Sequence, residues 1–296
     1  DALARGDGRA TVHVAVTSLS APNPLPLLLL VVLALAWIVW LWTQPRRLAL
    51  RRRRLQAAPF PEDWERILRR RVPLTRSMPA ELLAQLKGHM QVFVAEKAFI
   101  GCEGQAITDE VRVAVAAQAC LLLLNRPTGY DPRLRQVLVY PRAFWVLHTH
   151  PDEHGLVHGG REARVGESWD EGQVILAWDE TRDSARIPDD AFNVVLHEFA
   201  HQLDAENGLT NGAPELGSAQ RHARWAEVMR QAFVELQAQV ARGEETVLDP
   251  YGASEPAEFF AVATEAFFER GQDLRQTQPA VYAELAGFYH VDPAAW

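Results

Sequence analysis

Two histidines four residues apart, with a glutamate directly after the first, form the strongest chemical motif in the sequence. His197, Glu198 and His201 lie in the pentapeptide HEFAH. Side chains four residues apart share one face of a helix, so both imidazoles can bind a single zinc ion, and the glutamate can act as general base on a water at the metal. Solvated histidines on a surface helix are the alternative. However, residues 192–203 are largely apolar, and a buried histidine pair without a metal would be costly.

A catalytic zinc needs a third protein ligand and an open position. The extended pattern HExxHxxGxxH is absent, because Asp204 and Asn207 stand where it requires glycine and histidine. The best candidate elsewhere is Glu258, which begins an otherwise apolar helix, where a carboxylate is typical of a ligand or a paired charge. An ordinary first-turn glutamate, favoured by the helix dipole, is the alternative. Glu265, two turns later on the same face, is a competing ligand or a partner of one, and Asp204 could orient a ligand imidazole.

Two predicted helices must bring these side chains together. Hydrophobic spacing predicts one helix over residues 190–205, which starts at the acidic pair 189–190, and another over 254–270, with Ser254 as its cap. Further helices are predicted over residues 59–100, 109–124, 218–241 and 278–289, and short strands over 137–140, around 156–157 and over 174–178. The economical interpretation is one α+β domain over residues 59–296, predominantly helical with a small sheet.

An apolar segment precedes this domain. Residues 25–42 read LPLLLLVVLALAWIVWLW, eighteen residues without a charge, and three tryptophans stand near its end, where a membrane interface would lie. We predict an uncleaved transmembrane helix over residues 25–43 rather than a cleaved signal peptide, because the apolar run is long and arginines follow it instead of a small-residue cleavage site. Residues 1–24 are expected to form a disordered extension.

Charge is divided unevenly along the chain. Residues 1–76 hold 13 Lys/Arg and 5 Asp/Glu, whereas residues 77–296 hold 17 and 33. Six arginines follow the apolar segment in a basic juxtamembrane linker, residues 44–58, and two precede it, so the positive-inside rule places the following domain in the cytoplasm. The basic linker beside an apolar segment indicates membrane lipid as a partner, and the acidic remainder argues against nucleic acid.

The remaining metal-ligating residue types give weaker signals. The only cysteines, Cys102 and Cys120, lack the spacing of a structural zinc site and fit a reducing compartment. Four histidines cluster in a segment that we interpret as a loop: His148, His150, His154 and His158. They could form a second metal site. Loop histidines are more often solvated or hydrogen-bonded, and we favour that interpretation.

Over most of residues 75–293 the sequence resembles the Mlc titration factor A family of bacterial zinc-dependent peptidases. The segments that carry the resemblance are VLVYPRAFWV (137–146), GLVHGGREARVGESWDEGQVILAWDE (155–180), FNVVLHEFAHQLD (192–204) and YGASEPAEFFAVATEAFFE (251–269). The resemblance implies a gluzincin-like fold in which Val174–Trp178 is a candidate substrate-binding edge strand. It also implies the site residues: zinc ligands His197, His201 and Glu258, the catalytic acid/base Glu198, and Tyr251 as a donor to the oxyanion.

These observations predict a zinc-dependent peptidase anchored as a single-pass protein in the bacterial inner membrane. The alternative is a regulatory protein that uses the same scaffold to bind and sequester a transcriptional regulator, with little peptidase activity. An intact Glu198 favours the enzyme, because a binding scaffold has no need of a general base. The founding family member lacks the apolar segment at 25–42, so its association with the glucose repressor Mlc is not carried over. The expected partners are a peptide or protein substrate, inner-membrane lipid and a regulatory protein.

Overall fold

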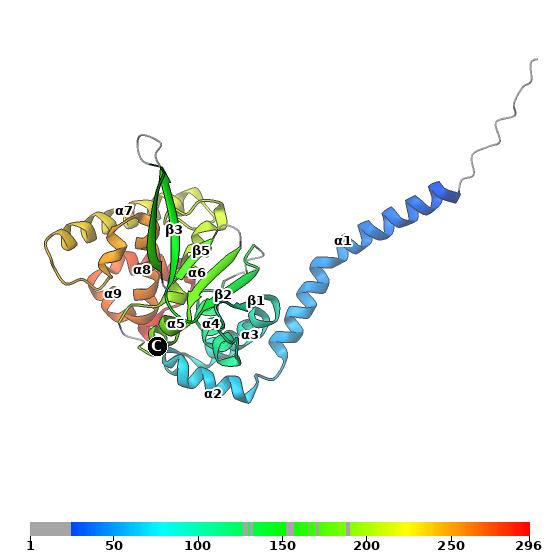
Figure 1. The fold of residues 1–296 in the computed structure, drawn as a ribbon, viewed down its shortest axis with the longest axis horizontal. Coiled ribbons are helices and arrows are strands. Elements are labelled where there is room, and N and C mark those ends of the chain that lie inside the picture. The colour runs from blue at the N-terminus through cyan, green and yellow to red at the C-terminus, as the bar shows by residue number, and fades with distance from the viewer. Residues whose placement is uncertain are drawn as a thin grey trace, which may run out of the picture. The chain divides into compact units, whose positions relative to one another are not determined.

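The computed structural model describes residues 25–126, 130, 133–151, 157–164, 166–169, 172–187 and 190–296, with the backbone alone for 144–151, 157–164 and 166–169. Two compact units divide the chain, Asp1–Arg51 and Arg52–Trp296. The predicted extension over residues 1–24 lies outside the described part of the chain. Figure 1 shows the order of the elements.

The first helix, α1, spans Leu25–Ala57 and includes the predicted membrane segment. The mean hydropathy of its most apolar 18-residue window is 2.6, so it is long and apolar enough to cross a membrane, a property that signal sequences share. Its last residues belong to the second unit, where the guanidinium of Arg52 donates to both carboxylate oxygens of Glu96 at 2.9 and 2.7 Å. The end of the predicted basic linker is therefore helical and bonded to helix α3, Ala80–Glu96.

A four-stranded sheet crosses the second unit in the order β1-β2-β6-β5. Strands β1 (Ala98–Gly101), β2 (Gln136–Tyr140) and β6 (Gln173–Ala177) are parallel, and β5 (Gly166–Trp169) pairs antiparallel with β6. The predicted strands at 137–140 and 174–178 are confirmed to within a residue. The predicted edge position of 174–178 is wrong, because β6 lies between two strands and β5 forms the edge.

An antiparallel hairpin is formed by β3 (Phe144–Pro151) and β4 (Val157–Arg164). Figure 1 shows it standing out from the sheet. The interpretation of the histidine cluster as a loop is therefore wrong in part, because His148 and His150 lie in β3 and His158 lies in β4, where it pairs with His150. His154 lies outside the described residues.

Helices make up most of the domain. The remaining α-helices are α2 (Glu62–Arg71), α4 (Asp109–Leu121), α5 (Trp178–Ser184), α6 (Val194–Asp204), α7 (Ala219–Ala241), α8 (Pro256–Glu269), α9 (Gly271–Thr277) and α10 (Pro279–Tyr289). The helices predicted over 109–124, 190–205, 218–241, 254–270 and 278–289 are confirmed with small shifts at their ends. The helical prediction over 59–100 is wrong at its end, because residues 98–101 pair with β2 as strand β1.

Helix α6 lies at the centre of this arrangement. It packs against α8 and α4 and against strands β5 and β6 (Figure 1). Helix α8 is buried along nearly its whole length, and an aromatic cluster fixes it to α7 and α10: the rings of Trp225, Phe260 and Phe288 lie with centroids 5.7–6.0 Å apart. Burial of each such ring contributes about 1.5–3 kcal/mol. Helix α8 is therefore fixed in place by α7 and α10, and it packs against α6, which carries HEFAH.

Candidate metal centre

Helix α6 presents HEFAH because its ends and its apolar face are well defined. Asn193 caps the helix, and its side-chain oxygen accepts a hydrogen bond from the backbone N–H of Leu196 at 3.0 Å. Asp190, which the sequence suggested as the start, instead accepts a bond from the N–H of Phe192 at 3.1 Å. The buried residues of α6 include Val195, Leu196, Phe199 and Ala200. This packing leaves the two histidines on the face directed at α8.

The start of α8 is set by a turn that also carries Tyr251. Asp249 accepts a bond from the N–H of Tyr251 at 2.8 Å and so caps the 3₁₀ turn Pro250–Ala253. The predicted cap, Ser254, instead donates to the carbonyl of Tyr251 at 2.7 Å. Pro256 then fills the first position of the helix, where its missing N–H costs nothing. Tyr251 is thereby placed immediately ahead of the helix that carries Glu258.

Three predicted ligand atoms converge between the two helices. Nε2 of His197 lies 2.9 Å from Oε2 of Glu258 and 3.2 Å from Nε2 of His201, which in turn lies 3.4 Å from the same carboxylate oxygen. Ligand atoms at the corners of a zinc tetrahedron are about 3.3 Å apart, given zinc–ligand distances of about 2.0–2.1 Å. The three side chains are 12–15% exposed. The donor set and its spacing fit a single zinc ion.

The electrostatics of this group also favour a cation. Burial alone lowers the pKa of His197, but hydrogen bonds with Glu258 and Glu265 and the nearby carboxylate of Glu198 raise it well above the usual 6.5. Burial raises the pKa of Glu258, but its contacts with His197 and His201 outweigh that effect and hold this pKa well below 4.5. The surrounding carboxylates therefore favour a positive charge at His197, which a proton supplies in the zinc-free protein.

Glu265 meets the other nitrogen of the first histidine. Nδ1 of His197 lies 2.8 Å from Oε1 of Glu265, and Oε2 of Glu265 accepts a bond from the backbone N–H of Asn193. Burial raises the pKa of Glu265 in spite of these two bonds. Of the two roles that the sequence left open for Glu265, this geometry fits a partner that orients the imidazole, while Glu258 occupies the side where the second histidine lies.

Asp204 is bound to the chain that follows α6. Its Oδ2 accepts a bond from the N–H of Gly212 at 2.6 Å, and the residue is fully buried. Gly212 has φ +77°, and a Cβ there would lie 2.3 Å from the carbonyl oxygen of Pro256, so only glycine allows this approach to the start of α8. Within the described residues, no hydrogen bond joins Asp204 to Nδ1 of His201. The contacts of Asp204 thus support a role in joining α6 to α8.

Glu198 and Tyr251 complete the predicted set. Glu198 is buried and acts electrostatically on His197. The ring of Tyr251 lies 6.1 Å from that of His197, at an interplanar angle of 37°, and the residue is 51% exposed. A buried carboxylate thus follows the first histidine, and an exposed phenol lies at the rim. The fold brings together the three residues predicted as zinc ligands and the two predicted as catalytic.

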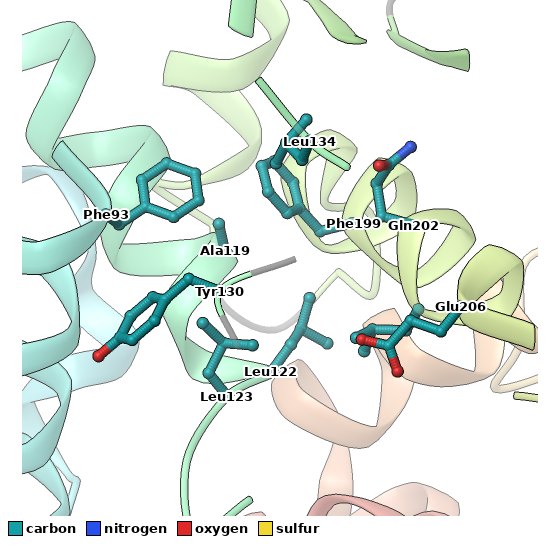
Figure 2. Close-up of a pocket in the computed structure, with 10 residues that line it drawn as sticks. Phe93, Ala119, Leu122, Leu123, Tyr130, Leu134, Phe199, Gln202 and Glu206 are labelled. Atoms are coloured by element: carbon teal, nitrogen blue, oxygen red, sulfur yellow. The ribbon is translucent and has the colours of Figure 1, made fainter. Parts of the chain in front are cut away.

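A small cavity lies elsewhere along α6. Phe93 of α3 and Phe199 of α6 both line it, with ring centroids 5.7 Å apart, and Figure 2 shows the mainly apolar side chains that surround it. Its volume is about 30 Å³, enough to hold a water molecule. None of the predicted zinc ligands or catalytic residues lines it, and it is too small for a peptide.

Two residues at the site were not singled out from the sequence. Asn193 bonds to Glu265 through its backbone and to Glu269 through its side chain, with Nδ2 2.7 Å from Oε1 of Glu269. An asparagine directly before an apolar helical run is a capping signal that could have identified Asn193. No local pattern marks Glu269.

A family model and several individual proteins each match most of the chain. Residues 46–290 match the family described as glucose-regulated metallo-peptidase M90. An uncharacterised protein of Synechocystis sp. is 41% identical over 256 residues, which cover 86% of this chain and 93% of that protein. The proteins named Mlc titration factor A of Yersinia pestis and Yersinia pseudotuberculosis are each 31% identical over 236 residues, 79% of this chain and 86% of theirs.

Proposed function

Because the chain belongs to the M90 family of metallopeptidases, we propose that it is a zinc-dependent peptidase with its active site between α6 and α8. The observation that carries this proposal is the convergence of ligand atoms from His197, His201 and Glu258 within 4.8 Å of one another. Glu198, adjacent to the first ligand, supplies the acid/base group that a simple metal-binding scaffold does not need.

The chain's own residues divide the chemistry of peptide hydrolysis. His197, His201 and Glu258 would hold one zinc ion, which when bound acts as a Lewis acid that activates water and polarises a carbonyl. Glu198 takes a proton from the attacking water and later delivers it to the leaving nitrogen. Tyr251 donates a hydrogen bond to the carbonyl oxygen as negative charge develops on it. The exposure of Tyr251 is consistent with this role, because a donor at the rim can reach a bound substrate.

Strand β5 is the proposed binding edge for an extended substrate. It is the outermost strand next to β6 in the described sheet, and it packs against α6. A peptide that adds to this edge would use main-chain hydrogen bonds and would pass beside the histidines of α6. This assignment replaces Val174–Trp178, which the strand order excludes from the edge.

We also place the protein at the bacterial inner membrane. Residues 25–43 of α1 would cross the bilayer once, residues 44–58 would follow as a basic juxtamembrane segment, and residues 59–296 would form the catalytic domain in the cytoplasm. The six arginines that follow the apolar segment support this orientation, because they retain the adjacent segment on the cytoplasmic side and attract anionic lipid. Residues 1–24 would then lie on the opposite side.

The decisive experiment compares the full chain with its Glu198→Gln variant. Zinc content is measured by atomic absorption, and cleavage is measured on a library of unstructured peptides, with and without a chelator. We expect about one zinc per chain in both proteins, cleavage by the wild type that the chelator abolishes, and a turnover at least about 10²-fold lower in Glu198→Gln. Unchanged cleavage by the variant, or cleavage that survives removal of zinc, would overturn the proposal.

A second candidate function follows from the name of the Yersinia relatives, which refers to titration of Mlc. On this alternative, the chain binds and sequesters a transcriptional regulator, and the zinc scaffold serves binding. Glu198→Gln separates the two functions, because it removes the general base while the ligands and the fold remain. The readout is expression of the genes that the regulator controls. A change in this expression that persists in Glu198→Gln supports sequestration, and a change that is lost together with peptide cleavage supports the peptidase.

A further inference from the structure

Asn193 uses all of its hydrogen-bonding groups at the junction of α6 and α8. Its carbonyl accepts from the backbone N–H of His197 at 2.9 Å, and its side-chain oxygen accepts from that of Leu196 at 3.0 Å. Its backbone N–H donates to Glu265, and its side-chain amide donates to Glu269 at 2.7 Å. Asn193 is 2% exposed and Glu265 is 3% exposed. One residue thus joins the first turn of α6 to two carboxylates, one turn apart, on α8.

These bonds form a closed path around the first histidine. Glu265 is held through Oε2 by Asn193, which leaves Oε1 for Nδ1 of His197. The backbone of His197 is in turn bonded to the carbonyl of Asn193. The imidazole is therefore fixed at its nitrogen and at its backbone by groups that converge on one asparagine.

We propose that Asn193 is a positioning residue, which acts with Glu269 to hold Glu265 against His197 and thereby sets the zinc affinity of the site. The inference rests on the proposed zinc-binding function. Partners of metal-binding histidines typically change metal affinity about 10- to 100-fold when they are removed. The bond from Asn193 to Glu269 acts one step further out, because it fixes the side of α8 from which Glu265 reaches the imidazole.

Asparagine fits this position better than the other capping residues. Serine and aspartate cap helices about as well. Serine, however, is too short to keep the bond to Glu269, and aspartate places a second carboxylate oxygen where the amide donor stood, 2.7 Å from Glu269. If only the helix cap mattered, all three residues would serve at position 193. If the bond from the side-chain amide to Glu269 matters as well, only asparagine serves; we call this bond the bridge. This difference makes the proposal testable.

The first experiment measures the zinc dissociation constant of the full chain by competition with a chromophoric chelator. In Asn193→Ser the cap and the backbone bond to Glu265 remain, and the bond to Glu269 is lost. Because this bond acts one step beyond the direct partner of the histidine, we expect zinc binding about 10-fold weaker, the lower end of the range for direct partners. Asn207→Ser is the matched control. Asn207 also accepts from a backbone N–H, of Leu209 at 2.9 Å, and donates to a carbonyl, of Ala213 at 2.8 Å, but on the exposed chain after α6. We expect its zinc affinity to equal that of the wild type.

The second experiment reverses the direction of the bridge. Asn193→Asp should lose zinc affinity like Asn193→Ser, and Glu269→Gln alone should bind zinc nearly normally, because the glutamine oxygen still accepts the amide bond. In the double variant Asn193→Asp/Glu269→Gln, the glutamine amide can donate to the aspartate, and we expect recovery to within about threefold of the wild type. Thermal unfolding of the zinc-free variants identifies any that fail to fold.

The outcomes separate this inference from the proposed function. Normal zinc affinity in a folded Asn193→Ser protein, or no recovery in the double variant, would overturn the role of Asn193 while the peptidase proposal stands. Wild-type protein that binds zinc but cleaves no peptide would overturn the peptidase, and the affinity comparison would still decide the role of Asn193. Wild-type protein that binds no zinc would overturn both.

Discussion

Zinc binding is expected to release a proton from His197, because the contacts of this imidazole raise its pKa. The pKa of His197 lies well above 6.5, because its contacts with Glu258 and Glu265 outweigh burial. The raised pKa favours a proton on His197 in the zinc-free protein at pH 7, and the metal must displace this proton in order to bind. We expect zinc binding to release about one proton at pH 7, and the apparent affinity to rise about tenfold per pH unit below that pKa.

The assay is isothermal titration calorimetry of zinc into the chelator-treated protein, in two buffers of equal pH and different ionisation enthalpy. The difference in observed heat gives the number of protons released. Glu265→Gln removes one of the carboxylates that raise the pKa of His197, so this variant should release fewer protons at pH 7. Glu235→Gln, at an exposed carboxylate, is the control and should behave as the wild type. A binding heat that does not depend on the buffer would refute this reasoning about His197.

Three further predictions concern single positions. Glu258→Ala should weaken zinc binding by more than about 100-fold, beyond the loss expected for an orienting partner, as measured by chelator competition; zinc retained at full affinity would exclude Glu258 as a ligand. Tyr251→Phe should lower kcat by about 10²-fold with the zinc dissociation constant unchanged, and an unchanged kcat would exclude it as the oxyanion donor. Gly212→Ala should destabilise the protein by about 1–3 kcal/mol in urea unfolding, because φ is positive and its Cβ would clash with Pro256; wild-type stability would mean that the chain between α6 and α8 relaxes at no cost.

The motif on α6 could be predicted from the sequence because its geometry is local. A spacing of four residues fixes the relative position of His197 and His201 once the segment is helical. The helix itself follows from its apolar periodicity. The cap at Asn193 lay within reach of the same reasoning, but the acidic residues at 189–190 were an equally plausible start. Local rules therefore define the motif well and its exact boundary less well.

The distinction between Glu258 and Glu265 could not be predicted in the same way. The two glutamates lie seven residues apart and share a face of α8, so helical periodicity treats them alike. Only the packing of α8 against α6 determines which nitrogen of His197 each carboxylate meets. The position of β6 inside the sheet has a similar origin, because β5 adds outside it through antiparallel pairing, and an apolar strand of five residues does not show its neighbours.

The interface between α6 and α8 buries several carboxylates, which is unfavourable for the stability of the fold. Glu198, Asp204 and Glu265 are all buried in or beside it, and Glu258 is nearly so. Carboxylates are rarely buried without compensating partners, and apolar residues of similar size often stabilise a core at least as well. Asp204 accepts a bond from the N–H of Gly212 and Glu265 accepts one from that of Asn193, yet burial still raises the pKa of both carboxyls. Glu258 and Glu265 in addition share His197, a residue with one positive charge at most. A dication between His197, His201 and Glu258 would offset this excess of negative charge more fully than a proton does, so the unfavourable composition of the interface is itself an argument for the metal.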